Sequence, residues 1–323
     1  MPEEELYAFL CGLRWPTTNG SPFCPRCGSV DLYPNRTRRQ WKCKDCGTIF
    51  SLTSGTVLHG MKLPLRKLVL AVLTYVNAVK GLSALQLARQ INVQHKTAFI
   101  LLHKLRGALL QGRPKTKMRG VVQIDGAYIM GSVRKVNRIS DPKQAQWQEA
   151  RRERAKQKKH CILVLRQADR LDKPSRTLTT VIKEEAKGNI LPFALDWVDR
   201  TATIVSDQHP AYAELAGFYK TEVVNHAKNF RGEKPIEHIN LAESYFSRFR
   251  RCSWGQVHKM SLRHLAAYAN EIAYREDTRR MPNGDIAQDV LSKALCGTKL
   301  DEWTCYSFRG RKSSRDRTLR LAA

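Results

Sequence analysis

The chain has 323 residues, a length that suggests two domains or one domain with appendages. Its residues are 42% hydrophobic and 26% charged, and this composition suffices for a folded core and excludes a disordered chain. Its 56 Lys and Arg residues exceed its 29 Asp and Glu residues, and the net charge of +27 indicates a polyanionic partner, either nucleic acid or an anionic membrane. The longest apolar run, "LVLAVLTYVNAV" at 68–79, is too short to span a bilayer, and the acidic start "MPEEELYAFL" is unlike a signal peptide. We therefore expect a cytoplasmic protein that binds nucleic acid and not a membrane.

Residues 1–20 are expected to form a short helix and a linker that lead into a zinc ribbon at residues 21–55. Two Cys-x2-Cys pairs, with fifteen residues between them, supply the predicted zinc ligands: Cys24, Cys27, Cys43 and Cys46. Each pair is followed by a glycine, and this pattern suits a tight turn whose two thiolates face one tetrahedral Zn²⁺. Disulfide bonds are the alternative, but a reducing compartment disfavours them.

Residues 62–111 are expected to form a DNA-binding helix-turn-helix. A helix is predicted over 63–81, and Ser83 followed by Gln86 is a typical start for the next one. After a turn at Asn92-Val93, the second helix of the hairpin opens with the side chains that would contact DNA: Gln94, His95, Lys96 and Thr97. A plain helical hairpin that packs on the ribbon is the alternative, although the ribbon and the basic charge favour DNA contact.

Beyond the basic linker at 112–120 the periodicity changes, and residues 118–280 are expected to form an α/β catalytic domain. The predicted order is three strands, a helix, a strand, a helix, a strand and a long final helix. The ranges are 121–131, 160–169, 176–182, 184–199, 201–207, 210–217, 221–226 and a helix from about 239. This order is that of an RNase H-like fold, a mixed sheet flanked by helices, here preceded by the zinc ribbon and the helix-turn-helix.

Two basic segments fall outside these elements. The segment 134–159 lies between the first two strands and carries ten basic and three acidic residues. A hairpin does not need 26 residues, so this segment is an inserted loop and either a DNA-backbone arm or an exposed basic loop. Residues 281–323 are expected to form a basic C-terminal tail.

Three carboxylates are candidates for one metal site. Asp125 lies within an apolar strand, where a charge costs several kcal/mol unless a cation or hydrogen bonds offset it. Asp207 ends the fourth strand, and an RNase H-like sheet places its first and fourth strands side by side. A turn or a helix N-cap is the ordinary alternative for Asp207, and a hydrogen-bonded turn before Gly126 is the alternative for Asp125. Glu243 follows Asp207 with thirty-five residues between, and on its helix face lie Asn240 and Arg250.

Several motifs of the chain resemble those of DDE transposases of bacterial insertion sequences, in the ISXO-like group with an N-terminal zinc ribbon. They include "CPRCGS", "LARQINVQHKTAFILLHKLR", "IDGAYIMG", "SDQHPAYAEL", "VVNHAKNF", "HINLAESYFSRFRR" and "REDTRRMPNGD". By this resemblance Asp125 and Asp207 are the two catalytic aspartates. The third catalytic residue is Asn240 or Glu243, and the spacing favours Glu243.

The resemblance implies a transposase that binds the terminal inverted repeats of its element, cuts a 3′ end and joins it to target DNA. The ligands Asp125, Asp207 and Glu243 would hold two Mg²⁺ or Mn²⁺ ions, whereas the thiolates would hold a structural Zn²⁺. Arg250 would bind the phosphate beside the cut. Self-association on paired ends and a place at the nucleoid in the cytoplasm are also implied.

Two other functions compete with this interpretation. A non-catalytic DNA-binding regulator with an inactive RNase H-like domain would not need the acidic residues. A nuclease acting on RNA–DNA hybrids would not need two DNA-reading modules. His209, His226 and His238 lie near the motifs, and each is expected to contact DNA, to bind a ligand or to serve the structure alone.

Overall fold

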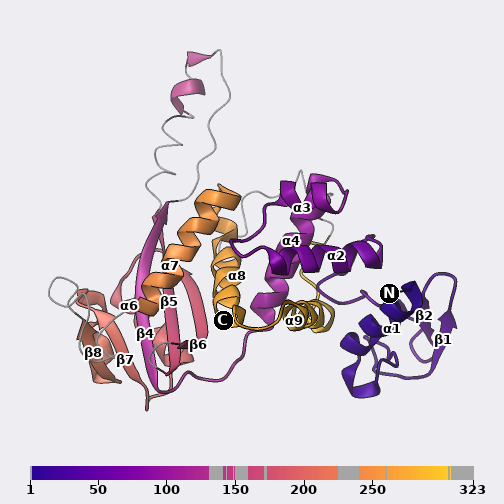
Figure 1. Ribbon diagram of the computed structural model, residues 1–323, viewed down its shortest axis with the longest axis horizontal. Helices are drawn as coiled ribbons and strands as arrows, with labels where there is room; N and C mark the ends of the chain where they lie inside the picture. Colours follow the sequence, from indigo (N-terminus) through magenta and orange to yellow (C-terminus); the bar gives the residue numbers. More distant parts are fainter. Residues whose placement is uncertain are drawn as a thin grey trace. The chain divides into compact units, whose positions relative to one another are not determined.

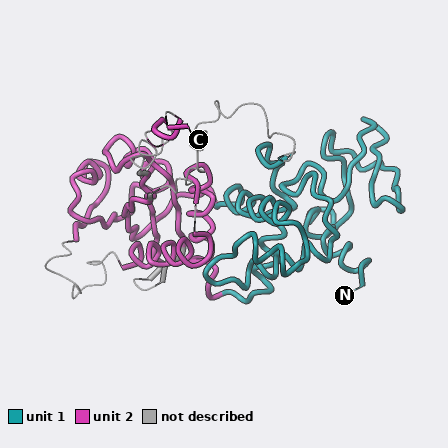
Figure 2. Tube along the Cα trace, turned by 90° about the horizontal axis from the view of Figure 1, so that it is seen from above, with its two compact units in different colours: residues 1–113, 281–323 teal, residues 114–280 magenta. Residues whose placement is uncertain are grey.

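A computed structural model describes residues 2–130, 141–142, 144–147, 149, 159–170, 173–224, 240–258, 260–304 and 306 (Figure 1). The chain forms two compact units, residues 1–113 with 281–323 and residues 114–280, which are coloured separately in Figure 2. Most of the basic segment 134–159 and the end of the basic tail lie outside the described residues. Within the described ranges, no helix is long and apolar enough to cross a membrane.

Unit 1 begins with a helix and a small antiparallel sheet of strand order β1-β2-β3. Its first elements are α1 (Glu3–Arg14), a 3₁₀ turn (Pro16–Thr18), β1 (Leu32–Asn35), β2 (Gln40–Cys43) and β3 (Ile49–Ser51). Trp41 on β2 lies at the centre of an aromatic cluster, with ring centroids 5.4 Å from Trp15, 5.6 Å from Phe50 and 6.2 Å from Tyr7. These large side chains join α1 to the sheet and give this small ribbon a core.

Three helices follow the ribbon in unit 1. They are α2 (Leu65–Asn77), α3 (Ala84–Gln90) and α4 (His95–Gln111). The hydroxyl of Ser83 accepts a hydrogen bond from the backbone N–H of Gln86 at 3.2 Å, so the predicted start of α3 is confirmed. Asn92 has a φ of +50°, and this left-handed residue lets the chain turn sharply between α3 and α4, which pack against each other.

The segment after residue 281 contains a helix that the sequence analysis did not assign. This helix, α9 (Asn283–Cys296), packs against α1, α2 and α4 through buried residues that include Ile286, Val290 and Leu291. Its apolar face explains why this part of the chain is not a basic tail but belongs to the core of unit 1. Backbone hydrogen bonds also join the residues after α9 to the ribbon segment, with the Val57 N–H donating to the Gly297 carbonyl at 3.1 Å.

Unit 2 contains a five-stranded mixed sheet of order β6-β5-β4-β7-β8. Its elements are β4 (Val121–Met130), β5 (Lys159–Arg170), β6 (Lys173–Ile182), α6 (Lys187–Trp197), β7 (Thr203–Asp207), a 3₁₀ helix (Pro210–Gly217), β8 (Lys220–Val224), α7 (Asn240–Cys252), a π-helical turn (Ser253–Val257), a 3₁₀ turn (Leu262–His264) and α8 (Leu265–Thr278). β4, β5 and β6 pair antiparallel, whereas β7 runs parallel to β4 and to β8. The first and fourth strands of the domain are therefore neighbours, as predicted.

The two faces of this sheet are covered by different helices. Ala127 of β4 and Val205 of β7 belong to a buried cluster with α7 and α8. Val122 and Ile124 of β4 belong to a second cluster with Ile190 of α6 and the 3₁₀ helix on the opposite face. Because side chains alternate along a strand, the odd-numbered positions of β4 and β7 face α7.

Candidate active site and zinc ribbon

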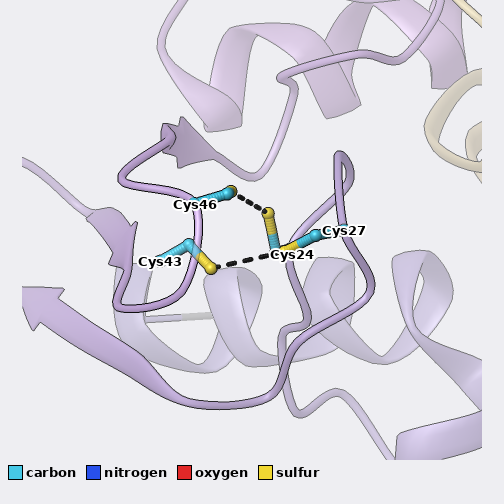
Figure 3. A group of neighbouring side chains, drawn as sticks. All are labelled: Cys24, Cys27, Cys43 and Cys46. Carbon is cyan, nitrogen blue, oxygen red and sulfur yellow. Dashed lines mark hydrogen bonds between the residues drawn. The ribbon is translucent and has the colours of Figure 1, made fainter.

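The four predicted zinc ligands lie together at two turns of the ribbon (Figure 3). The sulfur atoms of Cys24, Cys27, Cys43 and Cys46 all lie within 4.8 Å of one another. The Cys24–Cys46 and Cys27–Cys43 sulfur pairs are each 3.5 Å apart. A tetrahedral Zn²⁺ with Zn–S bonds of about 2.3 Å needs sulfur atoms about 3.8 Å apart, so the four thiols fit a structural zinc ion.

The glycine after each cysteine pair closes its turn. Gly28 and Gly47 have φ values of +78° and +68°, in the region that favours glycine. The Gly28 N–H donates to the Cys24 carbonyl at 2.9 Å, and the Gly47 N–H donates to the Cys43 carbonyl at 3.1 Å. These turns bring both thiols of each pair to the same side of the backbone.

We expect the purified protein to hold one zinc ion per chain. Replacing both Cys43 and Cys46 with Ser should release the ion, because two ligands are lost, and the ribbon should then unfold. Metal analysis and thermal unfolding would measure the two effects. Cys296→Ser is the matched control, since Cys296 is an exposed thiol outside the ribbon. A folded wild-type protein without zinc would contradict the assignment.

The aspartates of β4 and β7 lie on the same face of the unit 2 sheet. The parallel register pairs Val121 with Thr203 and Gln123 with Val205, so its continuation places Asp125 opposite Asp207. Both are odd-numbered positions and face α7. The backbone N–H groups of Gly126 and His209 donate to Oδ1 of the preceding aspartates, Asp125 and Asp207, at 2.8 and 3.1 Å. The prediction that these two residues lie on neighbouring strands is thus confirmed, while their catalytic role stays a prediction.

The electrostatics of Asp125 indicate that several negative charges surround it. Burial is the main cause that raises the pKa of Asp125 from 3.8 to about 7, although the Gly126 N–H lowers it. The charges of Asp207, Glu185 and Glu243, in that order of effect, raise it further. A site that collects mutually repelling carboxylates is costly without a counter-charge, and a bound cation would supply one.

The candidates on α7 differ in what the structure shows of them. Glu243 lies in the first turn of the helix and is close enough for its charge to act on Asp125. Asn240 is the first residue of α7, Arg250 lies near the other end, and both are exposed, as Glu243 is. The structure therefore places Glu243 near Asp125, whereas the choice between Glu243 and Asn240 as the third ligand stays a prediction.

The three histidines near the motifs have no shown role in the site. Nδ1 of His209 accepts a hydrogen bond from the Ala211 N–H at 3.3 Å and caps the 3₁₀ helix after β7, which is a structural role. His226 and His238 lie outside the described residues.

A fourth carboxylate, Glu185, was missed by the sequence analysis. It lies in the loop between β6 and α6, and the hydroxyl of Tyr212 donates to its Oε1. The Glu185 N–H donates to the hydroxyl of Tyr128 at 2.9 Å. A side chain at Gly126 would overlap Oε1 of Glu185, so the glycine after Asp125 leaves room for this carboxylate. Glu185 has no regular spacing from the motifs, and only Gly126 in the sequence hinted that another group approaches there.

The carboxylates offer the hard oxygen donors that Mg²⁺ and Mn²⁺ prefer. Within the described residues, only the four cysteines form a group of three or more metal ligands with atoms all within 4.8 Å. The oxygen atoms of the carboxylates near Asp125 therefore do not form such a tight group.

In unit 1, the residues predicted to read DNA open helix α4. Gln94, His95 and Lys96 are exposed and Thr97 is half-buried. Farther along, α4 is enclosed, because Leu101, Leu105 and most residues between them are buried. Only the first turns of α4 are therefore accessible to a large partner such as a DNA duplex.

Comparisons with known proteins relate both units to proteins of insertion sequences. Residues 1–48 match the family model of the transposase zinc-ribbon domain, and residues 117–277 match that of the ISXO2-like transposase domain. A protein of Halobacterium salinarum, described as an uncharacterized protein in transposable element ISH50, is 27% identical over 292 residues. The similar region covers 88% of this chain and 95% of that protein.

Proposed function

The chain belongs to the insertion-sequence transposases that combine a transposase zinc ribbon with an ISXO2-like transposase domain, and we propose that it binds the ends of its element and catalyses metal-dependent cleavage and strand transfer of DNA. The observation that carries this proposal is the approach of Asp125, Asp207 and Glu243 from three separate elements to one face of the sheet. The strand order β6-β5-β4-β7-β8 supports an RNase H-like fold for residues 118–280.

The residues of the site would have three roles in phosphodiester cleavage: binding of the metal ions, orientation of the metal ligands and binding of the phosphate. Asp125, Asp207 and Glu243 would hold two Mg²⁺ or Mn²⁺ ions, with Asn240 as the alternative third ligand. When bound, these ions would lower the pKa of the attacking water or 3′-hydroxyl and would stabilise the negative charge on the leaving oxygen. The Gly126 and His209 N–H groups orient the two aspartates by binding one oxygen of each, which leaves the second oxygen available. Arg250, exposed on α7, would bind a phosphate near the cut.

The competing non-catalytic regulator would use the ribbon and α4 alone. It gives no reason to place the half-buried Asp125 within the influence of three other carboxylates, because this arrangement costs free energy and serves no DNA contact. The nuclease for RNA–DNA hybrids lacks support for a different reason. A zinc ribbon of the transposase type precedes the catalytic domain, and such an enzyme would not need it.

One assay tests the proposed reaction directly. The full chain is incubated with DNA that carries the terminal repeats of its own element, with Mg²⁺ or with EDTA. We expect nicking at the 3′ end of the element and joining of that end to target DNA, both only with Mg²⁺. Binding of these ends without any nicking, under all metal conditions, would favour the regulator.

We propose that α3 and α4 form a helix-turn-helix whose accessible first turns read the element ends. Gln94→Ala should reduce the preference for end sequences by about 1–3 kcal/mol, because a side chain that reads a base edge is lost. Lys96→Ala should weaken binding to all DNA and lower the slope of log K against log salt by about 1. Lys80→Ala is a control of equal charge change at an exposed site of unit 1. Filter binding or fluorescence anisotropy over a salt series would measure these effects, and end preference unchanged in Gln94→Ala would contradict this reading surface.

A further inference from the structure

Two buried polar side chains of the sheet reach the first turn of α7. Gln123 of β4 and Arg166 of β5 are direct partners across the two strands, and both are at most 2% exposed. Gln123 lies two residues before Asp125 on the same strand, so both side chains face α7. The helix that carries Asn240 and Glu243 is therefore bound to the strand that carries Asp125.

Gln123 and Arg166 form hydrogen bonds with both N–H and carbonyl groups of the first turn of α7. Oε1 of Gln123 accepts hydrogen bonds from the N–H groups of Leu241 and Ala242 at 3.1 and 3.4 Å. Arg166 donates to the carbonyl of Leu241 and, at 3.1 Å, to the hydroxyl of Ser244. The first N–H groups of a helix have no partner within the helix, so Gln123 satisfies two donors that would otherwise be unbonded.

The arrangement is costly compared with apolar packing. The guanidinium of Arg166 is fully buried and is balanced by Glu276, whose Oε2 is 3.3 Å away. Glu276 in turn accepts from Arg248 of α7 at 2.6 Å. Buried charges of this kind often contribute little stability, because desolvation offsets their attraction, and they are better explained by the single geometry that they specify.

That geometry decides where the third side chain of the site lies. An α-helix turns by about 100° per residue, so a slip of α7 by one residue would carry Glu243 and Asn240 away from Asp125. Apolar packing of α7 on the sheet is not directional enough to forbid such a slip. The hydrogen bonds of Gln123 and Arg166 forbid it, because they fit only one pair of N–H groups and one carbonyl.

We propose that Gln123 and Arg166 are positioning residues that fix the register of α7 on the sheet and so place the third metal ligand beside Asp125. This inference rests on the proposed function, because it assigns these residues to the metal site. It holds whichever of Asn240 and Glu243 is the third ligand, since both lie in the turn that is held.

The test compares three variants of the full chain. Gln123→Met keeps the length of the side chain but cannot accept a hydrogen bond, whereas Gln123→Glu keeps the acceptor. Tyr219→Phe is the matched control, because it removes a buried hydroxyl that donates to the Ala194 carbonyl at 3.1 Å in the same unit, on the face of the sheet opposite to α7. Four properties of each variant are measured. Calorimetry gives the affinity for Mn²⁺, and a cleavage assay gives the rate of nicking on element ends. Circular dichroism gives the melting temperature, and hydrogen exchange gives the exchange rates of the Leu241 and Ala242 amides.

We expect Gln123→Met to lose about 10–100-fold in Mn²⁺ affinity and in nicking, as other changes next to metal ligands do. Its melting temperature should fall no further than that of Tyr219→Phe, and the amides of Leu241 and Ala242 should exchange faster. Gln123→Glu should recover Mn²⁺ affinity and nicking. Should Gln123→Met fail to fold, Gln123→Asn, which withdraws the acceptor by one methylene, should show the same losses to a smaller degree.

Two results would overturn the inference. One is a Gln123→Met protein that binds Mn²⁺ and nicks DNA as well as Tyr219→Phe does. The other is a Gln123→Glu protein that is as impaired as Gln123→Met. If the wild-type chain itself neither nicks DNA nor binds Mn²⁺ in a manner that depends on Asp125, the proposed function has failed, and that outcome is distinct from either of these.

Discussion

Asp125→Asn and Asp207→Asn should each abolish nicking and strand transfer while leaving the binding of element ends intact. Each change removes one charged metal ligand and almost no volume. The metal ions contribute several kcal/mol of charge stabilisation to such a transition state, so we expect a loss of about 10³-fold or more. End binding should persist because the proposed reading surface lies in unit 1 and both aspartates lie in unit 2. Gel-based cleavage assays and anisotropy on the same DNA would measure both properties.

Asp125→Asn, which should abolish activity, should stabilise the metal-free protein against thermal unfolding. Burial and the neighbouring carboxylates raise the pKa of Asp125 from 3.8 to about 7. The stability associated with the protonated form is therefore fully present below pH 3.8 and is lost as the pH rises through 7. Asn is neutral throughout, so Asp125→Asn should melt at a higher temperature than wild type at pH 8 in EDTA, with a difference that shrinks towards pH 4.

Added Mn²⁺ should then raise the melting temperature of wild type but not that of Asp125→Asn, because only the native carboxylate binds the ion. Asp196→Asn on α6 is the control, since Asp196 is exposed. An Asp207→Asn protein that still cuts DNA would contradict the assignment of the site. So would an Asp125→Asn protein that is stabilised by Mn²⁺ as strongly as wild type.

Much of unit 2 could be predicted because its hydrophobic residues recur at the regular spacings of strands and helices. The apolar strand around Asp125 and the apolar run that ends at Asp207 identify β4 and β7, and the order of elements predicts that these two strands are neighbours. The two aspartates could thus be placed together before any coordinates. The helical stripe that contains Glu243 and Arg250 was visible for the same reason, because a 3.6-residue period marks one face of a helix.

Other features depend on tertiary contacts that leave no periodic trace. Glu185 approaches Asp125 from an irregular loop, held by the hydroxyl of Tyr212, and no spacing rule connects residue 185 to residue 125. Gln123 and Arg166 read as strand residues, and only the cross-strand register makes them partners. The helix α9 was overlooked because residues 281–323 were interpreted as one basic tail, although their basic excess lies beyond residue 308 and Ile286, Val290 and Leu291 form an apolar face before it.

Glu243→Gln should be as inactive as the aspartate variants, and Asn240→Ala should retain more activity. Glu243 lies one helical turn into α7, and its charge acts on Asp125. Asn240 is the first residue of the same helix and is exposed, as Glu243 is, but its amide would be a weaker ligand than a carboxylate. Single-turnover nicking in Mg²⁺ would rank the two variants, and Glu184→Gln, at an exposed site of the same unit, controls for the loss of one negative charge.

The reverse ranking would identify Asn240 as the ligand and Glu243 as a residue that orients it. Mn²⁺ separates these outcomes further, because a ligand that merely orients another can be compensated by an ion that tolerates poorer geometry, whereas a lost ligand cannot. Mn²⁺ should therefore restore nicking to Asn240→Ala but not to Glu243→Gln or to the Asp125 and Asp207 variants. Gln123 accepts hydrogen bonds from the N–H groups of Leu241 and Ala242, which lie between Asn240 and Glu243. Because Gln123 positions a ligand and is not one itself, Mn²⁺ should also restore nicking to Gln123→Met.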